Sequence, residues 1–462
     1  MVTYRTLNLL FKEKMLQSKR LIYIPIEIKS RELIGKLFLA SRAVDRGWSV
    51  VIGRDSTVRE FMKTGPVGIN IEPSIPERKL SRLKALKDAG FKNVSLCEEN
   101  ITYYDGEDYC NRKIGIKSIE QIELIFAVGE INKNDILKWR SNLHNKISVV
   151  GNPRFDILRK ELRVIYSDKV NIIKKNFGNF LLVSSNFSRV NPNDIHRRFV
   201  NQLSKNGMIA DVKHENYLKL EAEYHLLQMN GLKNLLEKFS SDNPTVKIIL
   251  RPHPNENHAM WKSWARPLDV KVIFEGSANE WILASGALLH AGCTTGAEAN
   301  ILDKPSFVYH SNLETKFRGI GDFSSISVAS SEELFKNLKN IGFFDENRLK
   351  TNINDKRFTK NFIEFDEFSY SSDLIIDSLE KITIVKSDLL DFKHSNFLKY
   401  LNSKIYEIYI KYFLNKKSIK NKKFSYLLEN EVLVPITIWK NSGLIKVIPK
   451  ISRLRNDLFL LQ

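Results

Sequence analysis

Short apolar runs alternate with longer amphipathic stretches from Leu21 to Tyr309. Runs such as Val246–Leu250 and Ala287–His290 are almost continuously apolar, which is typical of parallel strands buried on both faces. This alternation predicts parallel sheets with helices on both faces, including a helix at Arg31–Arg46 that is closed by Gly47. The expected strands are Leu21–Ile28, Trp48–Gly53, Val67–Ile71, Val94–Glu98, Leu124–Val128, Ile147–Gly151, Phe180–Ser184, Val246–Leu250, Val270–Phe274, Ala287–His290 and Ser306–Tyr309.

The strand and helix pattern occurs twice. A lysine-rich helical connector at Lys160–Asn176 separates the two occurrences, and a long, mostly helical insertion follows the first strand of the second. From about Leu389 the alternation of strand and helix patterns ends, and the sequence predicts helices. The expected fold class is α/β and GT-B-like, with two Rossmann-like domains facing a cleft and a helical C-terminal extension; the pattern alone does not separate this arrangement from other two-domain α/β folds. The expected bounds are 1–175 for the N-terminal Rossmann-like domain, 176–388 for the C-terminal Rossmann-like domain and 389–462 for the helical basic extension.

Length and composition limit the possibilities. A chain of 462 residues is too long for one hydrophobic core, and 43% hydrophobic with 27% charged residues is typical of a soluble globular protein. The sequence has no apolar run long enough for a membrane span and no signal-peptide pattern. Three cysteines give neither a disulfide framework nor paired metal-ligand spacing, so we expect a cytoplasmic protein.

The formal charge is +19, from 72 basic and 53 acidic residues. Such an excess indicates either a solvated basic surface or an anionic partner, namely phospholipid headgroups, a phosphorylated acceptor lipid or nucleic acid. The excess is concentrated in Ser403–Phe424, where Glu407 is the only acid. A basic, aromatic stretch of this kind suits an anionic membrane surface, which predicts peripheral attachment to the inner membrane. No nucleic-acid-binding signature accompanies it, so nucleic acid is not expected as a partner.

Polar residues directly follow the strand in Val246–Pro254, at the sheet edge where open α/β folds bind ligands. Prolines on both sides of His253 prevent a helix from beginning there and hold the imidazole in an extended turn. His253 and Pro254 are therefore candidate donor-binding residues, with His253 donating a proton or hydrogen bond to a leaving phosphate. Arg251 is placed either to neutralise phosphate charge or to pair on the surface.

The second such segment is Ala287–Asn300, in which Thr294, Thr295 and Gly296 lie where a strand gives way to a helix. This junction offers backbone N–H groups and the positive end of a helix dipole to an anion. Glu298 has two interpretations: a capping box with Thr295, or a carboxylate that accepts hydrogen bonds from ribose hydroxyls. The two segments together predict a nucleotide-sugar site.

Acidic side chains at the ends of other strands are candidates for catalysis. Glu98 and Glu99 end a predicted strand, where paired carboxylates can raise the pKa of one member and create a general acid or base. The alternative is that both are solvated turn residues. In Gly151–Asp156, Asp156 is either a helix-dipole partner or a nucleophile, and Arg154 lies near the expected cleft.

The first strand-to-helix loop lies on the same side of the expected cleft. Lys29 and Arg31 would suit an anionic substrate, Glu27 is a further candidate on the acceptor side, and Ser30 would cap the helix. The sequence has no phosphate-binding P-loop, dinucleotide fingerprint, nucleophile elbow, His-Glu-x-x-His site or Asp-x-Asp pair. We therefore expect no metal and no cofactor, with phosphate charge met by helix N-termini, hydroxyls and basic side chains.

Six ordered motifs give the chain a family resemblance between Ile22 and Tyr309: IPIEIKSREL, LCEEN, ELIFAVGE, VVGNPRFD, LRPHPNEN and HAGCTTGAEA. The chain resembles the bacterial family of surface carbohydrate biosynthesis proteins and, through it, GT-B transferases that use CMP-activated acidic sugars. Bacterial sialyltransferases of this type share an acidic motif that supplies the catalytic base and an HP motif that contacts the CMP phosphate. Glu98-Glu99-Asn100 is similar to the first, with Asn in place of Gly, and His253-Pro254 matches the second.

The resemblance implies transfer of a 3-deoxy-ulosonic acid, Kdo-like or a related nonulosonic acid, from a CMP-activated donor to a lipid-linked or growing cell-surface glycan. Similarity to retaining transferases makes Asp156 the candidate nucleophile; otherwise the enzyme inverts, with Glu98 or Glu99 as base. Two alternatives stay open. One is a CDP-glycerol-type polyol-phosphate transferase, which differs at Cys293–Gly296, and the other is a non-catalytic subunit that binds nucleotide sugar or glycolipid.

Overall fold

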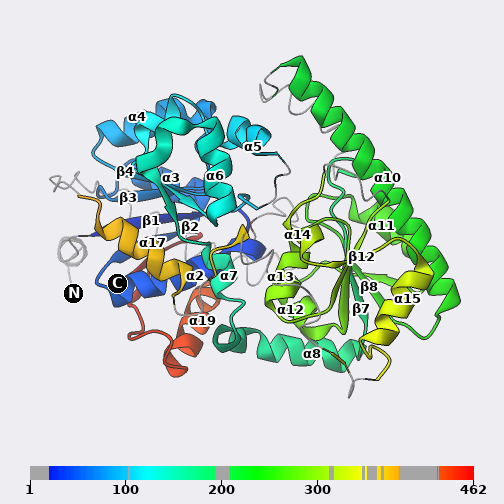
Figure 1. The fold of residues 1–462 in the computed structure, drawn as a ribbon. Coiled ribbons are helices and arrows are strands. Elements are labelled where there is room, and N and C mark those ends of the chain that lie inside the picture. The colour runs from blue at the N-terminus through cyan, green and yellow to red at the C-terminus, as the bar shows by residue number, and fades with distance from the viewer. Residues whose placement is uncertain are drawn as a thin grey trace.

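The computed structural model describes residues 20–101, 103, 105–192, 209, 211–311, 317–345, 349–350, 362–365, 369–383, 424 and 426–462. The described chain forms two α/β domains that lie side by side (Figure 1). Most of the predicted basic stretch, 403–423, lies outside the described residues.

The first domain is built on a sheet whose six parallel strands follow the order β2-β1-β3-β4-β5-β6. β1 and β2 are buried along almost their whole length, because helices cover both faces of the sheet. The strands are β1 (Leu21–Ile26), β2 (Ser49–Arg54), β3 (Ile69–Glu72), β4 (Lys92–Leu96), β5 (Leu124–Ala127) and β6 (Ile147–Val149). The helices are α2 (Lys29–Asp45), α3 (Asp55–Met62), α4 (Leu80–Asp88), α5 (Gly106–Lys113), α6 (Glu130–Trp139) and α7 (Pro153–Asp156).

A short 3-10 segment (Lys160–Tyr166) and α8 (Ser167–Phe177) lead to the second domain, whose parallel sheet has the order β12-β11-β10-β7-β8-β9. Its strands are β7 (Leu181–Ser184), β8 (Ile248–Arg251), β9 (Val270–Val272), β10 (Ala287–His290), β11 (Ser306–Tyr309) and β12 (Ile326–Val328). Its helices are α10 (Val212–Asp242), α11 (His258–Ala265), α12 (Ala278–Ala284), α13 (Thr295–Ile301), α14 (Ile320–Phe323) and α15 (Ser331–Asn340).

In each sheet the chain starts at a central strand, builds to one side and then returns to build on the other. The strand order therefore reverses between β1 and β3 and between β7 and β10, and loops diverge there to leave a crevice at the carboxyl ends of the strands. Two doubly wound domains whose crevices face one another form the GT-B arrangement, as expected. The strand β12 was not among the predicted strands, because Ile326–Val328 is short and half-exposed.

The chain returns to the first domain after α15. Helix α17 (Ser371–Glu380) packs on α2 and α7, although the sequence assigned this region to the second domain. Helix α19 (Glu429–Asn441) also packs on α2, in agreement with a helical extension. The last residues differ from that expectation: β13 (Ile451–Arg455) and β14 (Leu458–Leu461) form an antiparallel hairpin, and β14 pairs with β2. The apolar run Leu458–Leu461 covers an otherwise open sheet edge, which explains its complete burial.

Candidate functional site

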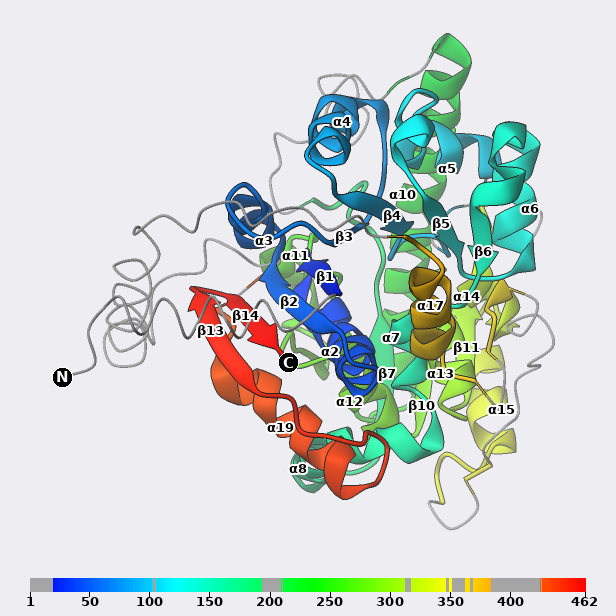
Figure 2. The same ribbon diagram turned by 90° about the vertical axis from the view of Figure 1, so that its left-hand side faces the viewer.

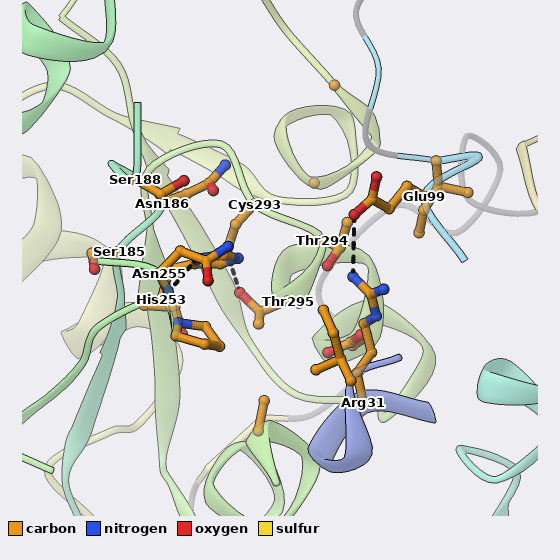
Figure 3. Close-up of a pocket in the computed structure, with 18 of the residues that line it drawn as sticks. Arg31, Glu99, Ser185, Asn186, Ser188, His253, Asn255, Cys293, Thr294 and Thr295 are labelled. Atoms are coloured by element: carbon orange, nitrogen blue, oxygen red, sulfur yellow. Dashed lines mark hydrogen bonds and ion pairs between the residues drawn. The ribbon is translucent and has the colours of Figure 1, made fainter. Parts of the chain in front are cut away.

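A cavity of about 380 Å³ lies between the domains at the carboxyl ends of both sheets, within the size range of small-molecule sites. The first domain contributes residues that follow β1 and β4, with Arg154 of α7, and the second contributes the loops that follow β7, β8, β9 and β10. Figure 3 shows Arg31 and Glu99 on one side, His253 and Asn255 on the other, and Thr294 and Thr295 between them. The cavity therefore joins sequence motifs that lie far apart in the chain.

The loop after β8 carries His253 into the cavity lining. The backbone N–H of Asn255 donates to Nδ1 of His253 over 3.2 Å, so a neutral imidazole carries its proton on Nε2. Glu256, fully buried, fixes the loop: its Oε1 accepts from the backbone N–H of His253 at 3.2 Å and from Oγ of Ser185 at 2.9 Å. Nε1 of Trp261 donates to the other carboxylate oxygen at 2.6 Å. The prediction for His253 missed this carboxylate, which lies within the same LRPHPNEN motif.

Arg251 ends β8 and lines the cavity, although it is largely buried. Its guanidinium donates to the backbone carbonyls of Glu275 (2.6 Å) and Gly276 (3.2 Å), and lies over the rings of Phe274 and Trp281. Burial lowers the pKa of Arg251 to about 10, so the group stays charged at neutral pH. The nearby carboxylates of Glu280 and Glu275 partly offset the effect of burial on this pKa.

The start of α13 differs from the predicted capping box. Thr294 is the N-cap residue of the helix. The carboxylate of Glu298 accepts a hydrogen bond from Arg154 and does not form a capping box with Thr295. Thr294 and Thr295 both line the cavity, as predicted. Gly296 is buried behind them, where an added Cβ would lie 2.4 Å from Nε2 of His290 and 2.8 Å from the carbonyl of Gly321. Gly296 therefore allows close packing behind the turn rather than contact with a ligand.

The two adjacent glutamates occupy different environments. Glu99 lines the cavity with 41% of its side chain exposed, and it pairs with Lys113 and, at 3.8 Å, with Arg31. Burial opposes its ionisation, but Lys113 and Arg31 outweigh burial and lower its pKa to about 2. Glu99 is therefore not the member of the pair with a raised pKa, because Lys113 and Arg31 lie beside its carboxylate.

Glu98 points instead into a buried polar network beneath the cavity. Its carboxylate lies 3.4 Å from Nζ of Lys36 and accepts from Nδ2 of Asn152 at 3.3 Å. Lys36 also donates to Glu32 at 2.9 Å, and the carboxylate of Glu32 accepts from the backbone N–H groups of residues 27 and 28. This network links the loops after β1, β4 and β6. The only feature of the sequence that points to this network is the helical spacing of Glu32 and Lys36.

An ion pair between Arg154 and Glu298 crosses the floor of the cavity from one domain to the other. Arg154 also donates to the carbonyl of Glu98 at 3.2 Å, and both side chains of the pair are nearly buried. Both were predicted site residues and both line the cavity, but they contact each other. A ligand at this point would compete with the pair for either partner.

Asp156 does not line the cavity, and the prediction of a nucleophile there is wrong. Its buried carboxylate accepts from the backbone N–H groups of Ser371 (2.8 Å) and Ser372 (2.9 Å) and from the Ser372 hydroxyl (2.7 Å). These bonds close the N-terminus of α17, whereas the helix-dipole interpretation made from the sequence concerned the helix that contains Asp156 itself. Burial raises the pKa of Asp156 to about 6.

Only some of the predicted residues in and after the loop that follows β1 line the cavity. Arg31 and Ser30 line the cavity, but Glu27 is exposed outside the lining, and Lys29 donates to Glu431 at 2.6 Å and to the carbonyl of Tyr426. Because α2 already begins at Lys29, Ser30 is not its cap. The C-terminal extension therefore removes Lys29 from the predicted substrate-binding set.

Several lining residues were missed by sequence reasoning. Ser185 and Asn186 follow β7, and their position directly after a predicted strand was the signal that could have identified them. Helix α5 adds Arg112 and Lys113, which no motif marked. At this side of the cavity α10 contacts α5, where Nε2 of His214 lies 2.9 Å from Asp108.

Within the described ranges, no cluster of histidine, cysteine and acidic side chains could hold a metal ion. In the same part of the chain, no helix combines the length and apolarity needed to cross a bilayer.

No protein-family model and no curated protein matches the sequence. Solved structures with a similar chain path include UDP-GlcNAc 2-epimerase from Methanocaldococcus jannaschii in complex with UDP-GlcNAc and UDP, at 15% identity and a TM-score of 0.47, covering 78% of this chain and 99% of that one. The wall teichoic acid polymerase TagF, soaked with CDPG, has 12% identity and a TM-score of 0.45 over 79% and 88% of the chains. HepE of Anabaena in complex with UDP has 12% identity and a TM-score of 0.40, covering 79% of this chain and 100% of that one. At these values the likeness concerns the general chain path, and the fold assignment follows from the strand order of the two sheets.

Proposed function

We propose that this protein is a glycosyltransferase that moves a 3-deoxy-ulosonic acid from a CMP-activated donor to a cell-surface glycan. The observation that supports this most is the interdomain cavity, which brings His253, Arg251 and the Thr294–Thr295 turn together opposite Glu99. A cation, an N–H donor and two hydroxyls suit a leaving phosphate, and a carboxylate faces them from the other domain.

In this proposal the second domain binds the donor. His253 donates from Nε2 to a phosphate oxygen of CMP, while Asn255 and Glu256 fix the ring and its loop. Arg251 contributes positive charge from a buried position, which strengthens its interaction with an anion. As the bond from the anomeric carbon to the phosphate breaks, these groups stabilise the charge that develops on CMP.

The first domain supplies the base. Because Asp156 caps α17, we propose direct displacement rather than a covalent intermediate, with the acceptor hydroxyl attacking the anomeric carbon. Glu99 is ionised at neutral pH and accepts the proton of that hydroxyl once the substrates displace Lys113. Arg31 and Arg154, which both line the cavity, are the proposed contacts for the sugar carboxylate.

The polyol-phosphate alternative uses the same cavity with a different donor. A CDP-linked donor presents two phosphates to His253, Arg251 and the Thr294–Thr295 turn, and the transferred group carries one of them. The released nucleotide is CMP in both proposals, so what separates them is whether the donor that the site accepts carries one phosphate or two.

The test is a calorimetric titration of the protein with CMP, CDP, UDP and GDP, with and without EDTA. We expect selective CMP binding that is unchanged by EDTA and weakened at least tenfold in His253→Ala, since a hydrogen bond to a charged phosphate contributes about 1.5–3 kcal/mol. His144→Ala is the matched control, because His144 is exposed and outside the cavity lining.

Each result has a definite consequence. Tighter binding of CDP than of CMP would replace the ulosonic acid donor by a polyol-phosphate donor. Preference for UDP or GDP, or full CMP affinity in His253→Ala, would overturn the proposed site. CMP binding by a protein that transfers no sugar to any glycan would favour the non-catalytic subunit.

A further inference from the structure

Helix α19 exposes two adjacent apolar side chains on its outer side, among polar residues that include Asn430 and Lys440. Its inner face is buried through Val432, Ile436 and Trp439, as expected for a helix that packs on α2. On the opposite face, Leu433 and Val434 are 38% and 52% exposed. Packing on α2 does not explain why Leu433 and Val434 are apolar, since solvent-facing helix positions are usually polar.

The segment after α19 adds two more exposed aliphatic side chains, Val447 (46%) and Ile448 (48%). It is held in place: Asp45 accepts from the backbone N–H groups of Lys446 (2.8 Å) and Val447 (3.0 Å), and Lys440 of α19 donates to the carbonyl of Lys446 at 2.6 Å. Figure 2 shows α19 and the segment leading to β13 along one edge of the first domain. We call this surface the α19 face, defined as Leu433, Val434, Lys440, Lys446, Val447 and Ile448.

The charged side chains between Val432 and Arg455 are all basic. The sequence contains no acidic residue from Val432 to Arg455, whereas Lys440, Lys446 and Lys450 are exposed. Two acids next to this surface are engaged, because Asp45 accepts from the backbone of the segment and Glu431 pairs with Lys29. Aliphatic side chains surrounded by lysines match a bilayer surface with anionic headgroups, where the apolar groups enter the acyl boundary and the ammonium groups remain at the phosphates.

The α19 face is also connected to the cavity. Lys29 binds Glu431 and the carbonyl of Tyr426, which tie the start of α19 to the loop after β1. The next two residues of that loop, Ser30 and Arg31, line the cavity. We propose that the α19 face docks the protein on an anionic lipid surface, with the first domain nearest the bilayer. This inference concerns binding alone and does not depend on the proposed donor or reaction.

The test is vesicle flotation of the full chain, with vesicles of phosphatidylcholine alone or mixed with phosphatidylglycerol. We expect binding to the mixed vesicles that weakens as salt increases. Combined Leu433→Ser, Val434→Ser, Val447→Ser and Ile448→Ser substitutions should reduce partitioning at least about tenfold, and Lys440→Gln with Lys446→Gln should reduce binding to anionic vesicles only. Leu226→Ser with Leu227→Ser is the matched control, because these exposed residues lie on α10 of the second domain. Circular dichroism and thermal unfolding confirm that each variant is folded.

Three outcomes would overturn the proposal. The first is unchanged flotation of the folded quadruple variant. The second is loss of flotation only when the lysines between 416 and 423 are replaced by Gln, which would place lipid contact in that segment instead. The third is a dimer in sedimentation velocity that the serine substitutions convert to a monomer without any effect on flotation, which would identify the occupant as a second copy of the chain.

Discussion

At the scale of single residues, the two glutamates of the LCEEN motif separate into a cavity residue and a buried structural residue. Glu99→Gln should reduce transfer at least about 100-fold, because general acid–base groups contribute at least this much, and should leave CMP affinity within about twofold. Activity and calorimetry on the same preparations measure both effects. Glu130→Gln on the exposed start of α6 is the control. Full transfer by Glu99→Gln together with loss in Glu98→Gln would assign the base to Glu98.

Asp156 should make stability depend on pH. Its folded pKa of about 6 lies above the ordinary value of 3.8, so the folded state binds more protons between these values and stability falls as pH rises through them. The loss is on the order of 3 kcal/mol and is complete above about pH 6. Asp156→Asn lacks this proton. From pH 4 to pH 7 the free energy of unfolding of the wild type, measured relative to that of Asp156→Asn, should therefore fall by most of this amount, and a difference that does not change with pH would refute the assignment.

Residue-level prediction from the sequence succeeded where a motif directly follows a strand. His253, Thr294 and Thr295 could be placed because the carboxyl ends of parallel strands meet at one edge. Asp156 and Lys29 could not, because their partners are Ser371, Ser372 and Glu431, which lie hundreds of residues away in the chain. No local pattern encodes such contacts.

At the scale of elements, the packing of α13 on the end of β10 and on α14 depends on the absence of a side chain at Gly296. Gly296→Ala should push the helix away from His290 and Gly321, since the added Cβ would approach them to 2.4 Å and 2.8 Å. We expect a loss of stability of about 1–3 kcal/mol, typical of overpacking, and weaker CMP binding because Thr294 and Thr295 move with the helix. Thermal unfolding and calorimetry measure the two effects. Unchanged values in both would show that the turn adapts without cost.

Elements were predictable where hydrophobic runs are long and repeat. The eleven strands expected from apolar runs are all present. Their ends shift by a few residues, because contacts of the adjoining loops determine where each strand ends. The hairpin β13–β14 was missed because it follows a region without strand and helix alternation. Its pairing with β2 depends on an open sheet edge, which only the three-dimensional arrangement reveals.

At the scale of the whole molecule, the sequence predicted two Rossmann-like domains facing a cleft, because the pattern of strands restarts after the connector. It did not predict how the domains are joined. Arg154–Glu298 crosses the cavity floor and Asp108–His214 joins α5 to α10, and both pairs depend on the relative placement of two independently folded sheets. The described cavity is therefore a joint property of the two domains, and neither contains it alone.

The position of β14 also affects the order in which the protein can fold during synthesis. The second sheet uses strands between Leu181 and Val328, which leave the ribosome as one continuous stretch. The first sheet is made earlier, yet its edge at β2 stays uncovered until Leu458–Leu461 has been translated. Domains usually fold in the order in which they are made. Here the domain that starts first is completed last, and its exposed strand edge must remain protected from other nascent chains until translation reaches the hairpin.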